Sequence, residues 1–422
     1  METVLDTVVE RVKPPPTPVD AHFRMVVTMM EKDNYLGRLV TGRVASGRAR
    51  VGDRLRALQC VPAAGVTPAE GRVTKIMKRA GGFGRVTLAE AGVGDIVSIA
   101  GIGGASVTDT LAAVEVEAPL PAIAIDPPTL TMTFGVNDSP LAGRDGAHVT
   151  GSKIGARLLA EAETNVSIRV VQQAGGGESF EVQGRGELQL GVLIENMRRE
   201  GFELSVSPPA VLFRFDERGN KLEPVEELTA EVGEEHVGAV IEALSLRGAE
   251  LLDMVPGGGA AARTRMRMSC PSRGLLGFKS LFSTMTRGEG LLHRSFEGYA
   301  PLKTGLDQTR KGVLVSMASG TATGYTLMTL EERGTLFISP GTEVYDGMII
   351  GECARGEDME VNPSKEKKLT NVRNTGSEEQ VRLSPPRKIS LEEAIGYVQE
   401  GERIEVSTPS LPLSGDPVSS HL

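Results

Sequence analysis

The stretch GRGELQLGVLIENMRREGFELSV, residues 184–206, decides how the surrounding chain folds. Its apolar spacing predicts a helix over 187–200, because residues three and four positions apart share one helix face. Gly201 is expected to end this helix, since glycine readily adopts the left-handed conformation found at helix ends. Residues 202–206 then have the pattern of a strand. The residues expected on the buried helix face are Leu188, Val192 and Met197.

Residues 118–214 follow the order strand, helix, strand, strand, helix, strand. Ahead of the opening stretch, a strand is expected from Thr129, and Ser152 is placed to cap a helix that runs through Glu163. Two more strands are expected at 166–171 and 179–184. The apolar face of the first helix contains Ile154, Leu158 and Leu159. This order predicts a ferredoxin-like domain built from a split βαβ unit.

The same order repeats over residues 215–300. The expected strands are 223–232, 249–254, 262–268 and 290–296, and the expected helices are 234–246 and 274–286. A second ferredoxin-like domain is therefore predicted directly after the first.

Residues 21–117 contain many short apolar runs separated by Gly, Asp and Ser turns. This pattern predicts a small closed β-barrel. Residues 1–20 comprise a short helix over 1–12 and a proline cluster, which makes a stiff linker. We expect this segment to be a linker and the remnant of a preceding domain.

Residues 301–410 form the last predicted domain, which is β-rich and contains a long polar loop, 362–380. Loops of this length are uncommon in compact regions and are usually functional or disordered. Ser390, with Glu393 three positions later, begins a helix with a capping box. The tail, 411–422, is expected to be disordered. The predicted fold class is a multi-domain β and α+β protein: a β-barrel, two ferredoxin-like domains and a β-rich C-terminal domain with a basic loop.

The composition excludes several classes of protein. The net charge of −9 argues against a surface that is basic throughout, although local basic patches remain possible because charges act over about 10 Å at ordinary salt. The three cysteines lie far apart without metal-ligand spacing, which indicates reduced thiols. No apolar run approaches the roughly 18–20 residues that span a bilayer.

The sequence contains no recognisable catalytic, cofactor or metal site. Residues 146–153, GAHVTGSK, approach the phosphate-binding pattern but reverse its last two residues, so an ordinary helix start is preferred. No Asn-Lys-x-Asp motif is present to bind guanine, and the five histidines are scattered. We therefore predict that this chain alone has no enzyme activity and binds no cofactor.

The loop is the first candidate for RNA contact. Between Asn362 and Arg373 it has four cations and one acid, in a chain that is acidic overall. Thr370 and two asparagines add hydrogen-bonding groups for phosphate and sugar. The alternative is an ordinary solvated loop. The candidate residues are Lys365, Lys367, Lys368, Asn371 and Arg373.

A second basic cluster lies in residues 263–287. Three of its arginines alternate along one expected strand and therefore share one face of a sheet. Such a face suits the backbone of a structured RNA. The alternative is that salt bridges to the many acids neutralise it. The candidates are Arg263, Arg265, Arg267, Arg273, Lys279 and Arg287.

The module order and several motifs together resemble the TypA/BipA translational GTPases, relatives of elongation factor G and LepA. The 184–201 helix looks like that family's third domain, and PSRGLLGFK at 271–279 with MTRGEG at 285–290 looks like its elongation-factor-G-type fifth domain. KKLTNVR at 367–373 and GTEVYDGMIIG at 341–351 resemble the domain peculiar to TypA/BipA. The likeness extends to about residue 410.

The resemblance implies GTP-dependent ribosome binding, with the C-terminal loop reaching toward the A-site tRNA and the peptidyl-transferase region. By motif position it implies contacts from Lys367, Lys368, Asn371 and Arg373, with Lys365 beside them. GTP and magnesium are implied only for a GTPase domain expected ahead of residue 1. Two departures concern ribosome affinity: Gln189 replaces the family's histidine, and the tail lacks the family's basic extension.

The sequence thus predicts the ribosome- and rRNA-binding portion of a TypA/BipA-like translation factor. Its expected role is in translation regulation, ribosome assembly or stress response. Expected partners are the ribosome, rRNA and tRNA, without a membrane, and the expected state is a monomer in the bacterial cytoplasm or a plastid stroma. One alternative is a fragment of a complete ribosome-dependent GTPase. Another is a non-ribosomal RNA or protein adaptor.

Overall fold

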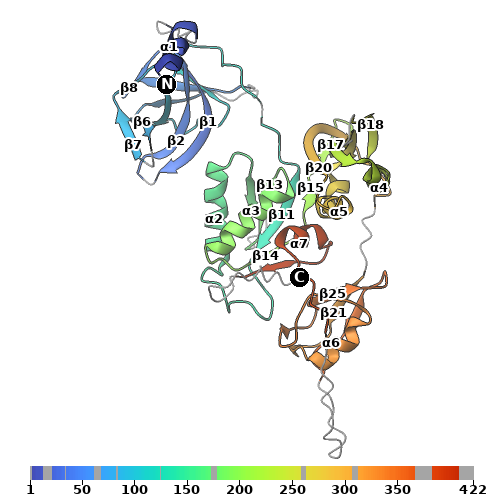
Figure 1. The fold of residues 1–422 in the computed structure, drawn as a ribbon. Helices are drawn as coiled ribbons and strands as arrows, with labels where there is room; N and C mark the ends of the chain where they lie inside the picture. The colour runs from blue at the N-terminus through green and yellow to red at the C-terminus, as the bar shows by residue number, and fades with distance from the viewer. Residues whose placement is uncertain are drawn as a thin grey trace, which may run out of the picture. The chain divides into compact units, whose positions relative to one another are not determined.

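The chain divides into two units, whose elements are drawn in Figure 1. The first contains residues 1–126 and 160–167, and the second contains 127–159 and 168–422. The computed structural model describes residues 2–12, 21–33, 35–60, 68–81, 84–123, 125–172, 178–257, 263–306, 312–365 and 383–407.

Residues 1–126 of the first unit contain, in their described part, one short helix and an antiparallel sheet with an aliphatic core. Among its described residues, eight strands pair in the order β5-β4-β10-β1-β2-β9-β6-β7, and β3 pairs with β8. Within that part of the chain, β5 and β7 each pair with one strand only, so closure into a barrel stays a prediction. The elements are α1 (Glu2–Arg11), β1 (Arg24–Asp33), β2 (Gly37–Ser46), β3 (Ala49–Arg50), β4 (Arg54–Leu58), β5 (Ala69–Arg72), β6 (Lys75–Ala80), β7 (Gly84–Leu88), β8 (Glu90–Ala91), β9 (Ile96–Ala100) and β10 (Thr110–Ala113).

The second unit begins with an antiparallel sheet in the order β12-β13-β11-β14. In this order β11 and β13, the first and third strands along the chain, lie side by side, with Met132 opposite Val182. The elements are β11 (Leu130–Gly135), α2 (Gly151–Thr164), β12 (Arg169–Gln172), β13 (Phe180–Gly184), α3 (Glu187–Arg199), β14 (Leu204–Val206) and β15 (Ala210–Val211), which pairs with β11.

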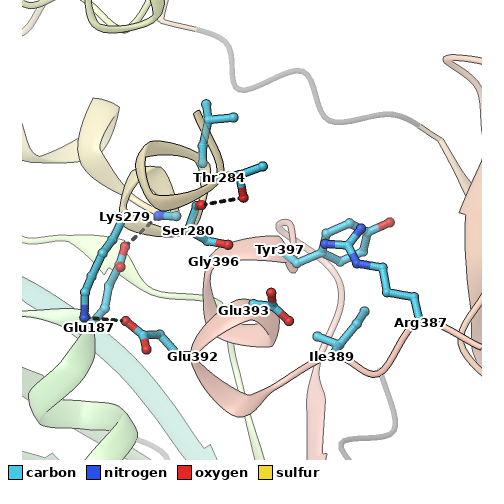
Figure 2. Close-up of a pocket in the computed structure, with 12 residues that line it drawn as sticks. Glu187, Lys279, Ser280, Thr284, Arg387, Ile389, Glu392, Glu393, Gly396 and Tyr397 are labelled. Atoms are coloured by element: carbon cyan, nitrogen blue, oxygen red, sulfur yellow. Dashed lines mark hydrogen bonds and ion pairs between the residues drawn. The ribbon is translucent and has the colours of Figure 1, made fainter. Parts of the chain in front are cut away.

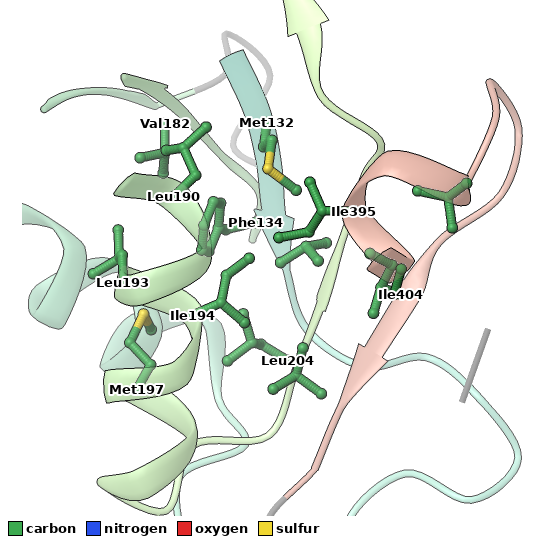
Figure 3. Packing of buried hydrophobic residues seen from close by; sticks show 14 of the residues in the cluster. Met132, Phe134, Val182, Leu190, Leu193, Ile194, Met197, Leu204, Ile395 and Ile404 are labelled. Atoms are coloured by element: carbon green, nitrogen blue, oxygen red, sulfur yellow. The ribbon is translucent and has the colours of Figure 1, made fainter. Parts of the chain in front are cut away.

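The last helix and strand of the described chain complete this first sheet. Strand β27 (Ile404–Val406) pairs antiparallel with β14, and helix α7 (Leu391–Tyr397) packs beside α3. Ile395 and Ile404 join the core that contains Ile194 and Leu204 (Figure 3). Ser390 forms the expected capping box with Glu393, so that prediction is confirmed.

A second sheet follows in the same unit. Strand β17 lies between β19 and β20, β18 pairs with the far side of β19, and the helices cover one face through Phe278 and Phe282. The elements are β16 (Arg214–Phe215), β17 (Lys221–Gly233), α4 (Glu234–Leu246), β18 (Glu250–Val255), β19 (Arg263–Pro271), the 3-10 helix η1 (Ser272–Leu275), α5 (Phe278–Met285) and β20 (Leu291–Pro301).

A third, smaller group of strands surrounds helix α6. The order is β23-β25-β21-β26, in which β21 and β26 run parallel, and β22 pairs with β24. The elements are β21 (Val313–Ser316), β22 (Gly320–Thr321), α6 (Gly324–Glu331), β23 (Gly334–Leu336), β24 (Glu343–Val344), β25 (Ile349–Cys353) and β26 (Met359–Val361). The coarse prediction of a β-rich α+β protein with several domains is confirmed. The individual domain boundaries stay predictions.

Several local predictions were wrong. Helix α3 buries Leu190, Leu193, Ile194 and Met197, so the prediction holds for Met197, whereas Leu188 and Val192 are exposed. Helix α2 begins one residue ahead of Ser152, which therefore lies inside its first turn, and Leu159, expected on its apolar face, is exposed. The helix expected over 274–286 is interrupted at Gly277, whose φ of 66° separates η1 from α5.

No helix in the described ranges is long and apolar enough to cross a membrane. Within the same ranges, no group of three or more His, Cys, Asp or Glu side chains could hold a metal ion.

The three cysteines differ in accessibility, which leads to the first prediction. Cys270 and Cys353 are buried, and Cys60 is partly exposed. Burial raises the pKa of the Cys270 thiol from 9.0 to about 12, so the reactive thiolate is scarce at neutral pH. In the native protein a thiol reagent is expected to modify Cys60 first, and Cys270 only after unfolding. Mass spectrometry of the labelled peptides measures this order; early modification of Cys270 would contradict it.

The raised pKa of Cys270 also has a consequence for stability. The folded state disfavours the thiolate, so the contribution of the Cys270 thiol to the free energy of unfolding is fully present below about pH 9. That contribution is expected to be lost as pH rises toward 12, the pKa of the folded state.

Candidate nucleic-acid interface

Strand β19 presents three arginines on one face of the second sheet. Arg263, Arg265 and Arg267 are exposed and alternate with the buried residues Thr264 and Met266. Met266 and Met268 pack against Phe278 and Phe282 in the core under the helices. Because strand side chains alternate between faces, the arginines lie on the opposite, open face. The prediction that these three share a face is confirmed. We call them the β19 arginines.

Glutamates on the neighbouring strand partly neutralise the β19 arginines. Arg267 donates from Nε and Nη2 to both carboxylate oxygens of Glu227, at 2.9 and 3.0 Å. Arg265 Nε lies 4.0 Å from Glu231 Oε1. The hydrogen bond from Arg267 lowers the pKa of the Glu227 carboxyl, so this carboxylate stays charged. Arg263 stands opposite Gly233, where β17 offers no acid.

The remaining residues of this face are mostly polar. His293 and Ser295 of β20 stand opposite Thr229 and Glu227, and Ser269 donates to Glu297 Oε2 at 2.9 Å. Such hydroxyl and imidazole groups hydrogen-bond phosphate and sugar oxygens, as nucleic-acid contacts commonly require. The open face therefore combines the three arginines with hydroxyl and imidazole groups and with the carboxylates of Glu227, Glu231 and Glu297. Asp253 of β18 also stands opposite Arg267.

Arg273 does not belong to this open face. Its Nε donates to Glu223 at 3.3 Å, and its Nη2 donates to the carbonyl of Lys303 at 2.6 Å. Glu223 is fully buried and also accepts the backbone N–H of Lys303 at 2.7 Å. These bonds join the end of β20 to the start of β17, so Arg273 has a structural partner.

Lys279 and Arg287 lie on the helical side of the sheet. Lys279, on α5, forms an ion pair of 2.7 Å with Glu392 of α7. Arg287 is exposed in the turn that ends α5, with a φ of 52°. The structure thus brings together the β19 arginines but places the other three cations of the predicted cluster elsewhere.

A groove of about 240 Å³ lies between α5 and α7 (Figure 2). At one end Glu187 Oε1 accepts the backbone N–H of Gly277 at 2.9 Å. Burial raises the pKa of the Glu187 carboxyl. The ion pair of Lys279 with Glu392 lies on the same groove. These contacts hold α3, α5 and α7 together and leave no row of cations in the groove.

The start of the basic loop is fixed to α6. The carbonyl of Lys365 accepts hydrogen bonds from Thr323 Oγ1 at 3.0 Å and from Thr326 Oγ1 at 2.7 Å. The Lys365 residue itself is exposed. The other predicted loop contacts lie outside the described residues: Lys367, Lys368, Asn371 and Arg373.

The segment that approaches a phosphate-binding loop does not fit a nucleotide. Glu203, which is 1% exposed, accepts the backbone N–H groups of Gly143 and Gly146 at 2.7 and 3.0 Å. It also accepts from Asn137 Nδ2 at 2.9 Å. Within the 146–153 segment, the amide of Gly146 is therefore occupied by a carboxylate of the chain itself, and the amides of Ala147 and His148 donate to the carbonyl of Gly201.

Sequence reasoning missed Glu227, Glu231 and Glu187. The first two lie four positions apart on β17 and therefore share one face of that strand, which was a usable signal. Nothing local to Glu187 indicated its contact with Gly277, because the two residues are 90 positions apart.

Two family models match the chain, and together they contain both candidate surfaces. The model of the elongation factor G C-terminus matches residues 220–310, which contain the β19 arginines. The model of the TypA/BipA C-terminal domain matches residues 311–416, which contain the basic loop.

Proteins named Large ribosomal subunit assembly factor BipA are similar over nearly the whole chain. The Bacillus subtilis protein is 41% identical over 414 residues, 98% of this chain and 66% of that protein. The Haemophilus influenzae protein is 42% identical over 412 residues, which cover 97% of this chain and 65% of that protein. The Synechocystis protein is 41% identical over 413 residues, which cover 98% of this chain and 68% of that protein. The chain belongs to the TypA/BipA family. It spans about two thirds of the length of these TypA/BipA relatives.

Proposed function

We propose that this chain is the ribosome-binding portion of a TypA/BipA translation factor that acts in assembly of the large ribosomal subunit. The observation that carries the proposal is the row of β19 arginines on an open sheet face in a chain of net charge −9. Cations in a row neutralise successive phosphates and release counterions, which provides affinity without reading base sequence. The names of the BipA relatives support a ribosomal target.

The finer parts of the proposal follow the family resemblance. In it, residues 21–117 are a translation-factor β-barrel, residues 118–214 and 215–300 are ferredoxin-like domains, and residues 301–410 are the family's own C-terminal domain. The loop at 362–380 reaches toward the A-site tRNA and the peptidyl-transferase region. The chain acts as a monomer in the bacterial cytoplasm or the plastid stroma, in translation regulation or stress response.

In this proposal, no described residue binds or hydrolyses a nucleotide. GTP and magnesium belong to the part of a TypA/BipA protein that this chain does not match. The proposed ribosome docking therefore depends on surface charge and shape alone.

The second prediction tests the β19 arginines by sedimentation with purified large ribosomal subunits. The triple variant R263A/R265A/R267A is expected to bind about tenfold or more weakly. The slope of log affinity against log salt is expected to become shallower by about one for each phosphate that the variant no longer neutralises. The matched control is R48A/R50A/R54A, which removes three exposed arginines of the first unit.

Two further arms separate the alternatives. E227A frees the guanidinium of Arg267 from its bidentate partner and is expected to strengthen binding to the large subunit. Competition with bulk structured RNA distinguishes a ribosomal target from a general RNA adaptor, since only the adaptor would be displaced. Unchanged affinity and salt slope in the triple variant would contradict the proposal.

A further inference from the structure

Strand β18 is an edge of the second sheet with an apolar surface. It pairs with β19 on one side, and within the described residues no strand pairs with its other side. All six of its residues are exposed. Four are large and apolar, with exposed fractions from 47% to 54%: Leu251, Leu252, Met254 and Val255. Edge strands of this kind present free N–H and C=O groups and accept further strands.

A bulge increases the apolar surface of β18. The register with β19 shifts between Leu251 and Asp253, so Leu252 is an extra residue without a partner across the ladder. Leu251 and Met254 stand opposite the buried residues Met268 and Met266, whereas Val255 stands opposite the exposed Arg265. Apolar side chains therefore project on both faces of the strand.

Helix α4, which leads into β18, gives this edge an acidic neighbour. Its sequence contains Glu234, Glu235 and Glu242, all exposed, and no lysine or arginine. Leu246, at the end of α4, is 78% exposed. Arg265 and Arg267 of β19, which stand opposite Val255 and Asp253, lie beside Glu231 and Glu227. Arg247 donates inward to the carbonyls of Gly274 and Leu276, and Lys303 pairs with Glu250.

The protein itself shows how such an edge is covered. Strand β27 adds to the edge strand β14 in antiparallel register, with Leu204 opposite Val406 and Val206 opposite Ile404. All four of those side chains are buried in the same core. The corresponding side chains of β18 have no such cover among the described residues.

We propose that β18 accepts an extended, positively charged segment of a partner protein as an added strand. Main-chain hydrogen bonds to the free edge would provide affinity, and apolar side chains at alternate positions would cover those of β18. Lysines or arginines in the segment would meet the glutamates of α4. RNA does not fit an apolar and acidic edge. A second copy would bring two such acidic helices together, in a chain that is already at −9.

The experiment uses the full chain and a fluorescein-labelled peptide of sequence KVKIRVKV, followed by fluorescence anisotropy. This peptide is expected to bind at least tenfold more tightly than EVEIEVEV, and tenfold more tightly than a version N-methylated at alternate residues, which cannot complete the ladder. Hydrogen exchange is expected to slow in β18 when the basic peptide is bound.

The variant L252K/M254K, with both changes at exposed positions, is expected to weaken peptide binding at least tenfold. The control L188K/V192K adds the same charge to the exposed face of α3, where these residues are 59% and 51% exposed, and should leave binding unchanged. Equal binding by the N-methylated peptide or by L252K/M254K would overturn the proposal. It would also be overturned if sedimentation equilibrium showed a dimer that L252K/M254K converts to a monomer, because β18 would then belong to a second copy.

Discussion

Replacing Glu226 by alanine is expected to lower the free energy of unfolding of the second sheet by about 3–5 kcal/mol. Glu226 is 6% exposed and accepts two hydrogen bonds from Arg294, at 2.8 and 3.0 Å. The side chain of Arg294 is itself only 24% exposed. Removing the carboxylate leaves a cation that is largely withdrawn from water and no longer has its bidentate partner. Urea unfolding followed by circular dichroism measures the change.

The neighbouring residue provides a matched control. Glu227 also forms a bidentate pair with an arginine, but on the open face, where Arg267 is 45% exposed. An ion pair in contact with water contributes little, so E227A is expected to cost at most about 1 kcal/mol. The double variant E226A/R294M should recover most of the stability, because no unpaired charge remains buried. Equal destabilisation by E226A and E227A would contradict the account.

Most elements of the fold could be predicted from the sequence because their signals are local. The repeated order of strands and helices follows from apolar periodicity. The start of α7 follows from the capping box of Ser390 and Glu393, and the end of α3 follows from Gly201, which has a φ of 87°. In each case the signal lies within a few residues of the element that it defines.

The buried face of α3 was predicted wrongly because Leu188 and Val192 form a second apolar stripe. The residues that are buried, Leu190, Leu193, Ile194 and Met197, have the i, i+3, i+4, i+7 spacing of one helix face. Leu188 and Val192 fit one stripe, and Leu190 and Ile194 fit another. The sheet and α7 decide between the two stripes, and α7 contributes Ile395 from about 200 positions away in the chain. Periodicity within α3 contains no information about that partner.

The candidate site was predictable only in part, for a similar reason. Alternation on one strand was sufficient to place the β19 arginines on one face. The ion pairs that modify those charges depend on tertiary register: Arg267 and Glu227 are 40 residues apart, and Lys279 and Glu392 are 113 residues apart. Local composition therefore predicted that Arg273 and Lys279 are surface cations available to RNA, although both form ion pairs with glutamates of this chain.

Replacing Gly277 by alanine is expected to destabilise the packing of α7 by about 2–5 kcal/mol. A Cβ at this position would lie 2.7 Å from the carbonyl oxygen of Gly396 and 3.2 Å from its Cα, so backbone must move. Overpacking of this kind costs about 1–3 kcal/mol, and the left-handed φ of 66° adds roughly 1–2 kcal/mol for a residue with a side chain. A shift would also weaken the hydrogen bond from the Gly277 N–H to the half-buried Glu187.

Hydrogen exchange locates the effect of G277A, because α7 contacts α5 through Gly396 and through the pair of Lys279 with Glu392. Exchange is expected to quicken in α7 and β27 more than in β17 and β19, whose ladder does not involve Gly277. G288A is the matched control, since Gly288 has a φ of 79° but no atom lies within 4 Å of an added Cβ. G288A therefore reports the backbone strain alone, and the difference between the two variants isolates the contact with α7. If G277A and G288A destabilise equally, the close approach of Gly277 and Gly396 does not hold α7 in place.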